Sequence, residues 1–223
     1  EMIWKFIDNP EFRKIIGDLY AKKLGVKPLF YLASGSMIMI TNSKHPLIKP
    51  SDLDGLLIRV PSKALMEKIN TWGGKGVIMS SGEQIMAMQR GTVDGALTSL
   101  GDGVSRHIWE VQKYATVFQS PITHPFIINF KYYNKLPKDL REKLDSAAQK
   151  TQDYGRGMLA DLESGKLDTL KSKMEVNVLS PKEAEQWAKM LKPLSEKWVK
   201  DNGPEAKKLL DLMNQVHDEV ISK

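Results

Sequence analysis

The sequence predicts an α/β protein, and three observations carry that prediction. Between residues 56 and 112, short apolar runs of strand length alternate with stretches that have helical spacing. Capping residues and prolines mark the expected helix starts, and glycines follow several of the expected ends. A long helical pattern occupies much of the chain after Pro137. Strands that alternate with helices are typical of parallel βαβ units, so we expect a parallel sheet covered by helices.

The first expected elements are a helix and two separate strands. Asn9 is placed to cap the helix, Pro10 takes its first position, and Gly25 stops it. The extended runs that follow lie at 26–32 and 36–41.

The middle of the chain holds the alternating units. The run 56–60 is apolar except for Arg59, which is typical of a strand buried between helices. Ser62 is placed to cap the next helix, and Ser80 with Glu83 has the spacing of a capping box that opens another. Further strands are expected at 77–79 and 93–97, and a third helix at 102–112.

The second half contains more helix. Extended runs are expected at 115–118, 126–130 and 174–179. Leu136-Pro137 precedes a helix expected at 138–171, although each of its three central glycines disfavours helix by about 1 kcal/mol. Pro181 opens a further helix after its cap Ser180, and a last amphipathic helix follows Pro204.

Composition excludes several classes of protein. The chain has 223 residues, no cysteine and a net charge of +6, so disulfide scaffolds, thiolate catalysis and cysteine-based metal sites are ruled out. No run approaches the roughly 18 apolar residues of a membrane-spanning helix. Residues 1–7 lack the features of a signal peptide and the chain does not begin with Met, so we expect a fragment or a processed chain.

Arg59 is the residue with the clearest chemical implication. A charged side chain in a buried strand is costly unless it has a partner. Arg59 comes at the carboxyl end of its strand, just before Pro61, and ligands of open α/β sheets bind at that edge. A guanidinium there offers a planar set of donors to a carboxylate or phosphate. The alternative is that Arg59 pairs with an aspartate or glutamate of the same lobe.

The other polar residues carry weaker signals. Ser62 and the segment 80–83 begin helices at the same edge, where backbone N–H groups favour anions, but ordinary capping accounts for both. Asp94 fits a turn or a strand end. The four histidines lack metal-ligand spacing, although His124, which precedes a strand, could line a cleft. The sequence contains no nucleophile-elbow, phosphate-loop or dinucleotide motif.

Four segments together resemble one protein family. They are 52–61 (DLDGLLIRVP), 83–95 (EQIMAMQRGTVDG), 109–114 (WEVQKY) and 136–140 (LPKDL). In the same order, they are similar to the segments DLKGLKIRVP, EVYTALQTGVVDG, EVQKY and LPEDL of dicarboxylate-type solute-binding proteins of tripartite ATP-independent periplasmic (TRAP) transporters. The resemblance covers most of the chain and is best from Gly35 to Ala148.

The resemblance implies a two-lobe fold like that of periplasmic binding proteins, with long C-terminal helices and an incomplete first lobe that lacks its N-terminal portion. It assigns residues 1–36 and 123–161 to the first lobe, and residues 37–122 and 162–223 to the second. The implied function is a periplasmic receptor that closes on a small organic acid and delivers it to the permease subunits of a membrane transporter. We expect no enzymatic activity, cofactor, metal or nucleic-acid partner.

In that family, the arginine that matches Arg59 binds the carboxylate of the ligand. The expected ligand-binding residues of this chain are Arg59, Thr98, Ser81, Met37, Ser99 and His124. Thr98 stands where the family often has Asn, and Ser81 where it often has an aromatic residue. Met37 belongs to an apolar segment in which many members carry a second arginine. Because only one arginine is in place, we expect a monocarboxylate with an apolar or hydroxylated body.

Three other functions stay open from the sequence. A ligand-binding sensor module could use the same fold. A small α/β transferase or hydrolase would depend on Asp94 or His124 without a paired nucleophile and base. Nucleic-acid binding would rest on the net charge of +6 without the clustering of aromatic and basic residues.

Overall fold

The computed structural model describes residues 2–221, and their contacts divide the chain into two compact units. Unit 1 comprises Glu1–Ser34, Ile122–Met158 and Ser195–Lys223, and unit 2 comprises Gly35–Pro121 and Leu159–Leu194. The described helices are α1 (Met2–Asp8), α2 (Pro10–Leu24), α3 (Lys63–Thr71), α4 (Gln84–Gln89), α5 (Leu100–Ser105), α6 (Phe130–Lys135), α7 (Lys138–Lys171), α8 (Pro181–Met190), α9 (Lys192–Asn202) and α10 (Pro204–Ile221), with short 3-10 turns at Pro50–Leu53 and Ile108–Glu110. The described strands are β1 (Val26–Asn42), β2 (Leu57–Val60), β3 (Lys75–Ile78), β4 (Gly95–Ser99), β5 (Tyr114–Asn129) and β6 (Glu175–Val178).

The strands form one sheet in the order β3-β2-β4-β1-β5-β6. β2 runs parallel to β3 and β4, and β5 runs parallel to β6, as expected for βαβ units. The sheet is mixed, because β4 pairs with β1 in the antiparallel direction, with Ile40 opposite Leu97. The expectation of a parallel sheet is therefore right for the alternating units and wrong for β1.

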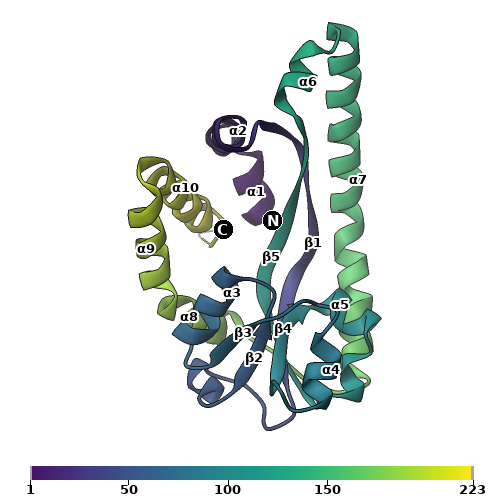
Figure 1. The fold of residues 1–223 in the computed structure, drawn as a ribbon, viewed down its shortest axis with the longest axis vertical. Helices are drawn as coiled ribbons and strands as arrows, with labels where there is room; N and C mark the ends of the chain where they lie inside the picture. The colour runs from purple at the N-terminus through teal and green to yellow at the C-terminus, as the bar shows by residue number, and fades with distance from the viewer. Residues whose placement is uncertain (1, 222–223) are drawn as a thin grey trace. The chain divides into compact units, whose positions relative to one another are not determined.

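Unit 2 has helices on both faces of its sheet (Figure 1). On one face, Met88 of α4, Leu100 of α5 and Leu170 of α7 belong to a single buried core with residues of β1, β4 and β5. On the other face, the rings of Trp72 and Trp187 lie 5.0 Å apart between α3 and α8. The Trp72 indole also donates to the Trp187 carbonyl at 2.9 Å. Coverage of both faces explains why β2 has so few polar residues.

Unit 1 gathers helices from both ends of the chain. The Asn9 side chain caps α2 by accepting from the backbone N–H of Glu11 at 2.8 Å, and Gly25 ends α2 at φ 66°, as predicted. Buried side chains of α1, α2, β1 and α10 form one core, and these helices lie together in Figure 1. Its buried members are Ile7, Phe12, Tyr31, Leu209 and Leu212.

The grouping of the last two helices differs from the expectation, which assigned residues 162–223 to the second lobe. The structure places Ser195–Lys223 in unit 1. The physical reason is the apolar face of α10, whose Leu209 and Leu212 bury themselves against Ile7 and Phe12. Burial of such side chains contributes about 1.5–3 kcal/mol each. The grouping of this helix is therefore decided by the apolar side chains of the first two helices, which are far away in the sequence.

Two expected pairs of strands are continuous in the structure. The runs at 26–32 and 36–41 join in β1, and the runs at 115–118 and 126–130 join in β5. Near Gly35, a buried carboxylate supports the chain: Glu163 of α7 accepts hydrogen bonds from the N–H groups of Ser36 and Met37. The run expected at 126–130 ends one residue too late, because its last residue already belongs to helix α6. Asn129 caps that helix by accepting from the N–H of Tyr132 at 2.9 Å.

The long helix α7 has the bounds that the sequence predicts. Glycine is favoured at position 155 of this helix despite its low helix propensity, because a side chain there would collide with Leu32 of β1. Among the helices of residues 2–221, α7 included, we find none with the combination of length and apolar character that membrane crossing requires.

Candidate functional site

Arg59 lies in β2, the strand between β3 and β4, and its side chain is 1% exposed. Its Nε donates to the carbonyl of Met79 at 2.9 Å, just beyond the end of β3. Its Nη1 donates to Oε1 of Gln84 at 3.1 Å, and its Nη2 donates to Oγ of Ser81 at 3.0 Å. The guanidinium is therefore fixed at the carboxyl edge of the parallel strands.

The acceptors around Arg59 are neutral. Within residues 2–221, no carboxylate lies within ion-pair distance of it, and the bonds described use three of its five N–H groups. Burial lowers the pKa of Arg59, the nearby Asp102 raises it, and Arg106 lowers it. An arginine remains protonated in proteins, so the site contains a buried positive charge. The alternative from the sequence, direct pairing with an acid of the same lobe, does not hold for the described residues.

Asp102 of α5 is the acidic group of the site. Its Oδ2 accepts from the Gln84 amide at 2.6 Å and from the Thr98 hydroxyl at 2.8 Å, while its Oδ1 accepts from Nε of Arg106 at 2.7 Å. Burial raises the pKa of Asp102, but the hydrogen bonds from Arg106, Gln84 and Thr98 outweigh burial, and the pKa lies below the ordinary value. Asp102 is thus ionised and paired with Arg106, which leaves one excess positive charge at Arg59.

The lowered pKa of Asp102 predicts a pH-dependent contribution to folding. Because the folded pKa lies below the unfolded one, this stability is present above the unfolded pKa and is lost as the pH falls through the folded pKa. We expect Asp102→Asn to lower the free energy of unfolding by about 1–3 kcal/mol near pH 7. The difference from wild type should shrink towards about pH 3, measured by urea denaturation. A difference that is constant over this range would contradict the assignment.

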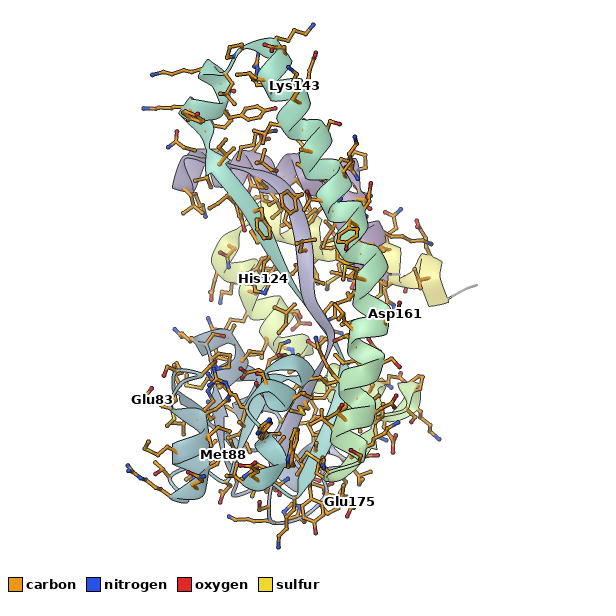
Figure 2. The ribbon with its side chains drawn as sticks, turned by 90° about the vertical axis from the view of Figure 1, so that its right-hand side faces the viewer. Glu83, Met88, His124, Lys143, Asp161 and Glu175 are labelled. Atoms are coloured by element: carbon orange, nitrogen blue, oxygen red, sulfur yellow. The ribbon has the colours of Figure 1, made fainter. Side chains whose placement is uncertain are left out.

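The structure brings four of the six expected site residues into this network. Ser81 binds Arg59, Thr98 binds Asp102, and Ser99 caps α5 by accepting from the N–H of Asp102 at 3.1 Å. Met37 packs against the apolar core of unit 2. His124 lies on the part of β5 that belongs to unit 1 (Figure 2).

One local expectation needs correction. The helix expected to start from Ser80 begins later, at Gln84, and Glu83 is its N-cap without a side-chain cap bond. The Ser80 hydroxyl instead donates to the Glu83 carboxylate at 2.5 Å. Asp94, one of the two residues on which an enzyme would have depended, accepts from the N–H of Leu57 at 2.8 Å and pairs with Lys44 at 2.7 Å. These bonds give Asp94 the structural role, at a turn or strand end, that the sequence favours.

Sequence reasoning missed Gln84 and Asp102. Gln84 is 0% exposed although it is polar, and it stands where the similar family segment has Val. A polar residue in place of an apolar one at this position was a signal that could have pointed to Gln84. Asp102 follows Thr98 by four residues, but the strand-to-helix junction between them conceals their contact.

A hollow described within unit 2 lies apart from Arg59. Its volume is about 390 Å³, and its lining includes Lys49, Trp72 and Met190. It also includes Gly73, which precedes β3, so this hollow is at the amino end of the parallel strands. Arg59 is at the carboxyl end, where Ser81 is partly exposed and forms the accessible rim of the network.

The fold is that of TRAP-transporter solute-binding proteins. A solved structure from Roseobacter denitrificans with bound β-D-glucuronate has a TM-score of 0.83 and 23% identity, and the match covers 95% of this chain and 69% of that one. A structure from Pseudomonas aeruginosa PAO1 with bound L-malate has a TM-score of 0.76 and 23% identity, over 87% of this chain and 68% of that one.

The particular family is shown by the sequence match. Residues 3–201 match the family described as bacterial extracellular solute-binding protein, family 7, and the chain belongs to this family. The C4-dicarboxylate-binding periplasmic protein DctP of Rhodobacter capsulatus is 28% identical over 92% of this chain. The chain spans 62% of the length of that relative. The family and the matched structures are described as solute-binding proteins.

Proposed function

We propose that this chain acts in a periplasmic receptor that captures a small organic acid through Arg59 and delivers it to the permease subunits of a TRAP transporter. The observation that carries the proposal is the buried guanidinium of Arg59, which is held by three neutral acceptors. A buried charge without a counterion is costly. A ligand carboxylate would supply the missing negative charge.

The network also suggests how the carboxylate binds. Two N–H groups of Arg59 are not used by the bonds described, and the Ser81 hydroxyl beside Nη2 can donate to an anion. Charge-assisted bonds to a guanidinium are about twice as strong as neutral ones. Binding at this rim would place the carboxylate against Arg59 while Asp102 stays occupied by Arg106.

The proposed ligand class is small organic acids. Ligands named for similar structures include L-malate and β-D-glucuronate, which carry two carboxylates and one carboxylate respectively. These names support the class and do not support a narrower preference. The preference for a monocarboxylate stays a prediction, because Met37 and its neighbours provide apolar side chains in the segment where a second arginine is common in the family.

The test is a calorimetric titration of the purified chain with D-glucuronate and D-gluconate, and with L-malate and succinate. We expect a monocarboxylate to bind at least about tenfold more tightly than the two dicarboxylates, which corresponds to about 1.4 kcal/mol. The physical reason is that a second carboxylate would lose its hydration without gaining a cationic partner. Tighter binding of the dicarboxylates would contradict the narrow preference, and no binding of any acid would contradict the receptor.

A further inference from the structure

Gln84 connects the two charged parts of the site. Its side chain is 0% exposed, its Oε1 accepts from Arg59 at 3.1 Å, and its Nε2 donates to Asp102 at 2.6 Å. A guanidinium only donates and an ionised carboxylate only accepts. One orientation of the amide therefore satisfies both neighbours, and the two charges hold it in that orientation.

The two neighbours of Gln84 differ in how their charges are balanced. Asp102 pairs with Arg106 at 2.7 Å, whereas Arg59 has neutral acceptors. A neutral amide at position 84 supports Arg59 without cancelling its charge. A carboxylate at the same position would have the same shape and would supply an internal counterion.

We propose that Gln84 is a positioning residue that orients Arg59 and keeps its positive charge available to a carboxylate ligand. The inference rests on the proposed function. It adds a residue that affects the affinity for the anion without touching the ligand, because it acts through Arg59. The absence of a carboxylate at position 84 is then as important as the amide itself.

The variant Gln84→Glu separates these effects, because its charge depends on pH. When protonated, the introduced carboxyl copies the amide: its carbonyl oxygen accepts from Arg59 and its O–H donates to Asp102. When ionised, it neutralises Arg59 and faces the carboxylate of Asp102. The charged groups around it are Arg59 from β2, Asp102 and Arg106 from α5 and its C-cap, and the exposed Glu83, which is bound to Ser80. Asp102 raises the pKa of the introduced group and Arg59 lowers it.

The experiment titrates wild type, Gln84→Glu and Gln84→Met with L-malate and D-glucuronate from about pH 5 to about pH 8, a range that spans raised carboxyl pKa values. At the upper end, Gln84→Glu should bind the better of the two acids at least about 30-fold more weakly than wild type, the lower limit for loss of a buried charge partner. Its affinity should recover as the pH falls. Gln84→Met keeps size and neutrality but loses the acceptor, so it should bind about tenfold more weakly at every pH.

The outcomes distinguish this inference from the proposed function. If wild type binds neither acid, both are overturned. If wild type binds and Arg59→Ala does not, but Gln84→Glu binds like wild type at the upper pH, only the inference fails. It also fails if Gln84→Met binds like wild type, or if the two Gln84 variants lose the same affinity at every pH. Circular dichroism of each variant confirms that it is folded, and the Gln84→Met result decides the positioning role even if Gln84→Glu does not fold.

Discussion

Replacing Arg59 with alanine is expected to weaken binding of the preferred organic acid by about 2–5 kcal/mol, the scale for removing one partner of a buried charge pair. The guanidinium is 1% exposed and has neutral acceptors, so the ligand carboxylate would lose its counterion in a site poor in water. Arg59→Lys should also lose affinity, because an ammonium cannot reproduce the planar set of donors. Calorimetric titration with D-glucuronate and L-malate measures both effects.

Arg90→Ala is the matched control for the loss of a positive charge. Arg90 belongs to the same unit and follows α4, but it is exposed. We expect its replacement to leave the affinity within about twofold of wild type, since exposed charges are screened. The role assigned to Arg59 would be wrong if folded Arg59→Ala, checked by circular dichroism, bound the acid as tightly as Arg90→Ala.

Gly95→Ala is expected to have the largest effect on stability, a loss of about 3 kcal/mol or more in the free energy of unfolding. Gly95 is buried in β4, paired with Asn42 of β1 on one side and with Ile58 of β2 on the other. A methyl group at Gly95 would overlap the carbonyl oxygen of Thr41 and lie 2.7 Å from its carbonyl carbon. Both atoms belong to the backbone of a central strand, so the collision cannot be relieved by rotating a side chain.

The control for Gly95→Ala is Gly165→Ala in the unit 2 part of α7, where a methyl group would meet no atom within 4 Å. Alanine favours helix over glycine by about 1 kcal/mol, so this variant should be slightly more stable than wild type. Urea denaturation of the two variants should therefore give shifts of opposite sign. If Gly95→Ala were as stable as wild type, the two strands could separate locally to make room for the methyl group, and the prediction would be wrong.

Elements with strong local signals were predicted closely. The cap at Asn9, the left-handed Gly25 and the helix from Lys138 to Lys171 all have their physical causes within a few residues of sequence. The expectations that failed involve distant partners. The break expected near Gly35 does not occur, because Glu163 supports the extended chain there from a helix far along the sequence. The last helix belongs to unit 1, because its apolar face matches the first two helices.

The candidate site shows the same division between local and distant information. Arg59 was recognisable because a charge in an apolar run of strand length requires an explanation. Ser81, Thr98 and Ser99 came from the family resemblance, and the structure connects them through Gln84 and Asp102. The sequence could not predict which charged and polar groups of this network contact one another, because its members come from β2, the turn after β3, α4, β4 and α5.

The amino-acid order was enough to identify the secondary-structure type, the alternating units and the buried arginine, since each depends on residue periodicity, capping or burial within one segment. Folding in three dimensions was needed to show which acceptors surround that arginine and which charge remains unbalanced. The hydrogen-bond partners of a buried group are chosen by packing between segments, and no local pattern encodes that choice.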